Sequence, residues 1–197
     1  MTDDAAAPPA GYRLVHTFGV TGRRALVWMN LIGVLVFLIG LAVVLAWRWL
    51  DDQLGRPLAL PGLPRALPEW VYLPLALATL AAHEGLHGAA IRLLGHRPRF
   101  GAKLTRLVLY TTADVYFTRA EYLIVTLAPI VGLSAAGLAA MLLAPAGSAP
   151  WLGILTAMNA AASVGDLWMA AVTASFPPQA RFRDREDGMS VYIPAPS

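Results

Sequence analysis

An uncharged apolar stretch of 23 residues, 25–47, constrains this chain more than any other feature of its sequence. At a rise of about 1.5 Å per residue, a helix of this length spans the roughly 30 Å hydrocarbon core of a bilayer. Charged residues make up only 14% of the chain, whereas soluble domains usually carry about 25%. The sequence therefore predicts an integral membrane protein and excludes an intrinsically disordered chain.

Three further apolar runs follow at residues 70–94, 122–144 and 151–176. We therefore expect an all-α integral membrane protein with four transmembrane helices in one domain, residues 25–176. Residues 1–24 would form an N-terminal segment and residues 177–197 a C-terminal tail.

The connection between the second and third runs has a different character. Residues 104–112 and 115–118 are rich in β-branched and aromatic side chains, and Ala113 and Asp114 lie between them. This pattern predicts a cytoplasmic or interfacial β-hairpin. An irregular interfacial loop is the alternative.

The distribution of basic residues predicts the orientation. Of the 15 basic residues, three precede the first run, six lie between the end of the second run and the start of the third, and three follow the fourth. The positive-inside rule then places both termini in the cytoplasm. The formal net charge of +3 gives no reason to expect a nucleic acid as partner, and the partner indicated is the lipid bilayer.

The second run contains the segment His83-Glu84-Gly85-Leu86-His87. Histidines at positions i and i+4 lie on one face of a helix, so both imidazoles can reach one metal ion, and Glu84 borders the same face. The chain has no cysteine, so a metal must be held by His, Asp or Glu. The alternative is a hydrogen-bonded polar cluster that only ties helices together.

Asp166 is the expected third ligand, because a catalytic zinc takes three protein ligands and a water. Counted from the cytoplasmic ends of their runs, His83, His87 and Asp166 lie at matching depth. Asn159 lies two turns before Asp166. Its amide could hydrogen-bond a substrate or a developing oxyanion as part of the catalytic machinery, or it could join two helices.

These motifs resemble those of the site-2 protease group of intramembrane zinc metalloproteases. The chain is most similar to a family of bacterial integral membrane proteins described as putative zincin peptidases. The resemblance is carried by the His83 to His87 segment, Asn159, Asp166 and Ala128-Pro129. It implies that His83, His87 and Asp166 bind Zn²⁺, that Glu84 is the catalytic acid and base, and that the membrane is the bacterial cytoplasmic membrane.

The function expected is therefore that of a membrane-embedded zinc metalloprotease. It would cleave peptide bonds of membrane-anchored or juxtamembrane substrates with a metal-activated water, and Glu84 would be the general base. A different class remains open, a non-proteolytic membrane metal-binding or regulatory scaffold, which would not need Glu84. A small transporter with a proton relay is a third reading.

Overall fold

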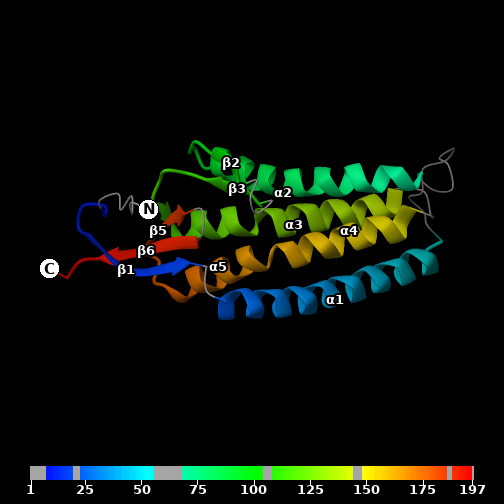
Figure 1. The fold of residues 1–197 in the computed structure, drawn as a ribbon, viewed down its shortest axis with the longest axis horizontal. Coiled ribbons are helices and arrows are strands. Elements are labelled where there is room, and N and C mark those ends of the chain that lie inside the picture. Colours follow the sequence, from blue (N-terminus) through cyan, green and yellow to red (C-terminus); the bar gives the residue numbers. More distant parts are fainter. Residues whose placement is uncertain are drawn as a thin grey trace. The chain divides into compact units, whose positions relative to one another are not determined.

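The structure, a computed structural model, describes residues 8–19, 23–55, 68–103, 108–143, 148–185 and 188–196. In these residues five α-helices and a short 3-10 helix are combined with six strands in two antiparallel sheets (Figure 1). The fold is therefore mixed α/β, and the prediction of an all-α protein was wrong. The two terminal segments, which were expected to be a leader and a tail, carry three of the strands.

The helices are η1 (Glu69–Val71), α1 (Arg23–Gln53), α2 (Tyr72–Leu93), α3 (Arg119–Leu143), α4 (Ala149–Ala162) and α5 (Val164–Ser175). By length and composition, only α1 and α3 among the described helices are long and apolar enough to cross a membrane. The prediction of four transmembrane helices was therefore wrong. Ionisable side chains interrupt the apolar character of α2, and the fourth predicted span is divided into two shorter helices.

The division between α4 and α5 occurs at Ser163. Both the backbone N–H and the hydroxyl of Ser163 donate to the carbonyl of Asn159, each at 3.0 Å. Ser163 has φ −75° and ψ 7°, outside the range of a regular α-helix. A continuous apolar sequence carries no strong signal for this break, because serine is tolerated inside helices.

The larger sheet has the strand order β1-β6-β5-β4, formed by β1 (Tyr12–Gly19), β6 (Gly188–Pro194), β5 (Arg181–Arg185) and β4 (Phe117–Thr118). The smaller sheet pairs β2 (Arg99–Lys103) with β3 (Val108–Thr112). Strands thus occur at residues 108–112 and 117–118 of the predicted hairpin, whereas its residues 104–107 lie outside the described part of the chain. The predicted pairing was wrong. β3 pairs with the preceding β2, and β4 pairs with β5 near the C-terminus.

The described residues group into two compact units. The first comprises Met1–Leu26, His87–Leu127 and Asp166–Ser197 and contains both sheets. Its centre is aromatic: the rings of Tyr122 and Phe182 stack at 5.6 Å, and Phe117 lies 5.7 Å from Tyr122. All three side chains are almost completely buried, so the sheet and the first turn of α3 share one apolar core.

A capping box fixes the start of α3 within this unit. The backbone N–H of Thr118 donates to the Glu121 carboxylate at 2.7 Å, and the N–H of Glu121 donates to the Thr118 hydroxyl at 3.3 Å. Two N–H groups at the helix terminus are thereby satisfied. Since Thr118 also ends β4, the cap joins strand and helix without a connecting loop.

The second unit comprises Val27–Leu86 and Ala128–Gly165. Small residues allow its helices to approach closely. A side chain at Gly40 of α1 would meet the backbone of Ala157 in α4 at 3.2 Å, and the indole of Trp47 donates to the Leu138 carbonyl of α3 at 3.2 Å. Such small-residue contacts are typical of helices that associate in a membrane.

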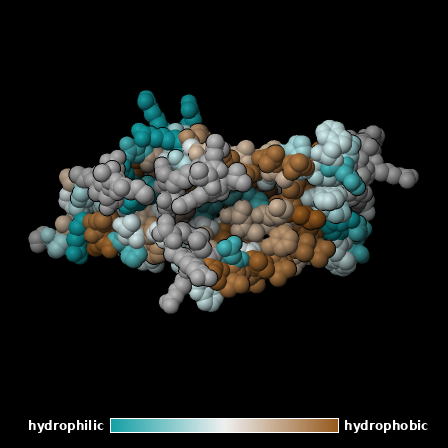
Figure 2. Space-filling view, viewed as in Figure 1, coloured by the Kyte–Doolittle hydropathy of each residue, from teal (hydrophilic) through white to brown (hydrophobic). Residues whose placement is uncertain are grey.

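Helix α1 directs most of its large apolar side chains outward. Only 6% of its most apolar window is buried inside the structure, so α1 is not the buried core helix of a soluble protein. Apolar residues also gather over large parts of the face seen in Figure 2. The exposed apolar side chains of α1 include Trp28, Leu31, Val34, Leu35, Leu38, Ile39, Leu45 and Trp49.

Candidate metal centre

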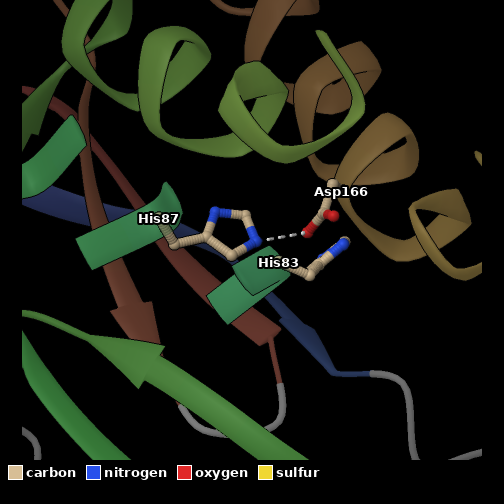
Figure 3. A group of neighbouring side chains, drawn as sticks. All are labelled: His83, His87 and Asp166. Atoms are coloured by element: carbon tan, nitrogen blue, oxygen red, sulfur yellow. Dashed lines mark ion pairs between the residues drawn. The ribbon is translucent and has the colours of Figure 1, made fainter. Parts of the chain in front are cut away.

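Two histidines of α2 and an aspartate of α5 point toward one another (Figure 3). His83 and His87 are one helical turn apart in α2, and Asp166 lies in the first turn of α5. One ligand atom from each residue lies within 4.8 Å of the other two. Each residue is only 8% exposed, which makes a group of three ionisable side chains costly unless a proton or a cation joins them.

The Nδ1 atom of each histidine has a hydrogen-bond acceptor in an adjoining helix. Nδ1 of His83 lies 3.0 Å from Oδ1 of Asn159 in α4. Nδ1 of His87 lies 2.8 Å from the carbonyl oxygen of Val125 in α3. Metal-bound histidines characteristically donate their second ring N–H in this way, which fixes both the tautomer and the orientation of the ring.

The amide of Asn159 is itself oriented by a second contact. Its Nδ2 atom donates to the carbonyl of Pro129 in α3 at 3.5 Å, which leaves Oδ1 as the acceptor facing His83. Nδ1 of His83 must then be the donor, and the same holds for Nδ1 of His87 because a carbonyl can only accept. In their neutral forms both histidines therefore present a lone pair at Nε2.

The distance between His87 and Asp166 fits a shared cation. Nε2 of His87 lies 3.4 Å from Oδ1 of Asp166, which is longer than the 2.7–2.9 Å of a direct charge-assisted hydrogen bond. Two ligands of a tetrahedral zinc at 2.0–2.1 Å are separated by about 3.3–3.5 Å. Two imidazoles and a carboxylate are also a ligand set that zinc accepts, so His83, His87 and Asp166 could hold a metal ion.

Glu84 and Asn159, the two residues predicted to be catalytic, lie in different positions. Glu84 follows His83 in α2, is partly buried, and is not one of the three grouped ligand residues. Asn159 is buried, and its oxygen faces the back of the His83 ring. The amide therefore contacts a candidate metal ligand in another helix, which fits the predicted link between helices, and contact with a substrate stays a prediction.

Asp184 of β5 was not predicted from the sequence, and its Oδ1 accepts a hydrogen bond from the Tyr122 hydroxyl at 3.0 Å. The pKa of the Asp184 carboxyl is raised to about 7, chiefly by burial and to a smaller extent by the negative charge of Asp166. The hydrogen bond from Tyr122 and the positive charge of protonated His87 act in the opposite direction. Asp184 thus acts electrostatically on two members of the candidate metal centre, and only pairing with β4 and β6 brings it there.

The candidate metal centre lies within a region that matches a known protein family. The model of a family described as putative zincin peptidase matches residues 76–181, more than half of the chain. The matched region includes His83, Glu84, His87, Asn159 and Asp166. No curated protein and no solved structure matches the chain at a significant level.

Proposed function

Because the chain belongs to the putative zincin peptidase family, we propose that it is a membrane-embedded zinc metalloprotease whose centre is formed by His83, His87 and Asp166. The observation that carries the proposal is the convergence of these three buried side chains, with both Nδ1 atoms already engaged. Bound there, zinc would supply a water acidified to a pKa of about 7 and a Lewis acid for a peptide carbonyl.

Glu84 is the proposed general base. It follows His83 in α2 and is not one of the three grouped ligand residues, and its carboxylate would take a proton from the attacking water. It would then return this proton to the leaving amine. A site that only stores or senses a metal has no use for such a carboxylate, and this argument favours the protease over a metal-binding scaffold.

We propose that the protein resides in the cytoplasmic membrane, with both termini in the cytoplasm. α1 and α3 have the length and apolar character of membrane spans. The pairing of β1 with β6 requires that the segments before α1 and after α5 lie on the same side of the bilayer. The excess of basic residues near these segments supports the assignment of that side to the cytoplasm.

The substrates proposed are membrane-anchored or juxtamembrane protein segments. A helical substrate must unwind before a peptide bond can be attacked. The two-stranded sheet β2–β3 could hold the unwound segment by strand addition, because main-chain hydrogen bonds do not depend on side-chain identity.

The test measures metal content and proteolysis on the same preparations. The probe is a set of fluorescein-labelled single-span peptides reconstituted with the protein in lipid vesicles. Glu84→Gln should retain zinc as wild type does and lose cleavage by roughly 10²–10⁴-fold. His83→Ala should lose the zinc itself. Glu69→Gln, at an exposed glutamate of η1, is the matched control and should leave both measurements unchanged.

If Glu84→Gln cleaves the peptides as fast as wild type while it holds zinc, Glu84 is not the base. If wild type binds zinc and cleaves none of the peptides, whereas Glu84→Gln binds zinc equally, the metal-binding scaffold becomes the better description.

A further inference from the structure

A proline lies inside a long helix, and its carbonyl contacts the amide that faces His83 of the candidate metal centre. Pro129 is the eleventh residue of α3 (Arg119–Leu143), and its side chain is almost completely buried. Proline in a helix interior has no N–H to donate, and its ring crowds the carbonyl of the residue four positions earlier. In α3 that residue is Val125.

The carbonyl of Val125 is the acceptor for His87. Its oxygen lies 2.8 Å from Nδ1 of the His87 ring. In an uninterrupted helix this oxygen would accept the N–H of residue 129. Because residue 129 is proline, the helix leaves a buried carbonyl without its usual donor, and a buried carbonyl requires another one.

The second histidine depends on the same turn of α3. The carbonyl of Pro129 accepts the amide of Asn159 at 3.5 Å, and the oxygen of Asn159 faces Nδ1 of His83 at 3.0 Å. The Val125–Pro129 turn therefore provides one backbone acceptor for His87 and a second for the residue that orients His83. The availability of the Val125 carbonyl depends on proline at position 129, whereas any residue at that position would supply the carbonyl that Asn159 contacts.

On the basis of the proposed metal centre, we infer that Pro129 is a positioning residue for His87. By withholding an N–H from Val125, it reserves the Val125 carbonyl for Nδ1 of His87. The imidazole is thereby held in the tautomer whose Nε2 lone pair faces Asp166 and the metal.

A purely structural role for Pro129 leads to a different expectation for zinc affinity. Replacement of an interior proline by alanine restores a helix hydrogen bond and improves helix propensity. If Pro129 only shapes α3, Pro129→Ala should leave zinc affinity as in wild type. If Pro129 positions His87, the same variant should bind zinc less tightly although its fold is equally or more stable.

The experiment compares wild type, Pro129→Ala and Pro150→Ala in detergent. Pro150 lies at the N-terminal end of α4, where proline is normally found and where no interior hydrogen bond is lost. The three measurements are the melting temperature without metal, zinc affinity by chelator competition, and the ¹⁵N shifts of the imidazoles without metal. The shifts are recorded at about pH 8, above the ordinary histidine pKa of about 6.5.

We expect Pro129→Ala to keep or raise the melting temperature and to weaken zinc binding by about 10–100-fold, the usual effect of removing a partner of a metal ligand. The His87 ring should show a mixture of tautomers, while the His83 ring stays as in wild type because the carbonyl of residue 129 is retained. Pro150→Ala should match wild type in zinc affinity and in both rings.

A carbonyl can accept two hydrogen bonds, so the new N–H could share Val125 with His87. Wild-type zinc affinity together with an unchanged His87 tautomer in Pro129→Ala would overturn the inference. The tautomer measurement requires neither zinc nor proteolysis. If wild type fails to cleave any peptide or to bind zinc, the proposed function fails, while the shifts of His87 still decide whether Pro129 positions the ring.

Discussion

The Oδ1 atom of Asn159 faces Nδ1 of His83 at 3.0 Å, on the side of the imidazole opposite to Nε2. The sequence left two roles for this amide, contact with a reacting group or a link between helices. The geometry adds a third role, the orientation of a metal ligand, and this role can be tested because loss of the amide should weaken metal binding.

We predict that Asn159→Ala weakens zinc binding by about 10–100-fold, because the His83 ring loses the acceptor that fixes its tautomer. At zinc concentrations high enough to saturate the variant, most of the cleavage rate should return. Chelator competition and cleavage at several zinc concentrations measure the two effects.

Met158→Ala, at the adjacent and largely exposed position in α4, is the control for Asn159→Ala. If instead Asn159→Ala keeps wild-type zinc affinity and its cleavage remains slow at saturating zinc, Asn159 stabilises a reacting group.

Asp166→Asn tests the carboxylate of the candidate centre. The substitution preserves the shape of the side chain and removes the one negative charge among the three ligand residues. Because the site is buried, loss of this charge should greatly reduce zinc occupancy and not only the rate of turnover. Zinc content after dialysis gives the measurement, and Asp52→Asn at an exposed position of α1 is the control. An Asp166→Asn protein with full zinc content would remove Asp166 from the ligand set.

Local sequence predicted the candidate centre better than the fold. The spacing of His83 and His87 is a property of a single helix, and Asp166 was found because few carboxylates lie within apolar segments. The hydrogen bonds to Val125 and Asn159 were not predicted. They depend on how α3 and α4 approach α2, and no periodicity in one segment encodes that approach.

The sheet was missed for a related physical reason. In β5 the buried Phe182 has an arginine on each side in the sequence, so the sequence of this strand resembles that of a solvated basic tail. β1 pairs with β6 across almost the whole length of the chain, and neither strand carries a local signal for its partner. The predicted hairpin was wrong for the same reason. Strand propensity correctly indicated strands near residues 108–112 and 117–118, but it did not indicate the strands with which they pair.

The raised pKa of Asp184 predicts a pH-dependent stability of the metal-free protein. Its pKa is about 7 in the folded state, against an ordinary value of 3.8, so the folded state binds the proton more tightly than the unfolded state. The stability contributed by this proton is fully present below about pH 4 and is lost as the pH rises through 7. Asp184→Asn stays neutral and can still accept the hydrogen bond from Tyr122, so its melting temperature should fall less between pH 5 and pH 8.

The comparison uses the difference between wild type and Asp184→Asn at each pH, because all other ionisable groups are the same in both proteins. Asp52→Asn should retain the wild-type dependence. An Asp184→Asn protein with the same loss of melting temperature as wild type would show that Asp184 titrates at its ordinary pKa.

The pairing of β1 with β6 predicts that both strands lie on the same side of the membrane. Because the chain contains no cysteine, single introduced cysteines can test this prediction. Single cysteines at the exposed positions Thr17 in β1 and Gln179 before β5 should be labelled from the same side of the membrane. Gln53, at the end of α1, should be labelled from the opposite side if α1 crosses the bilayer. A membrane-impermeant maleimide applied to intact cells should therefore modify Gln53→Cys, and should modify Thr17→Cys and Gln179→Cys only after the cells are opened.

Cysteine-free wild type gives the background labelling. Labelling of Thr17→Cys and Gln179→Cys in intact cells would invert the proposed orientation, and labelling of only one of the two would contradict the strand pairing itself.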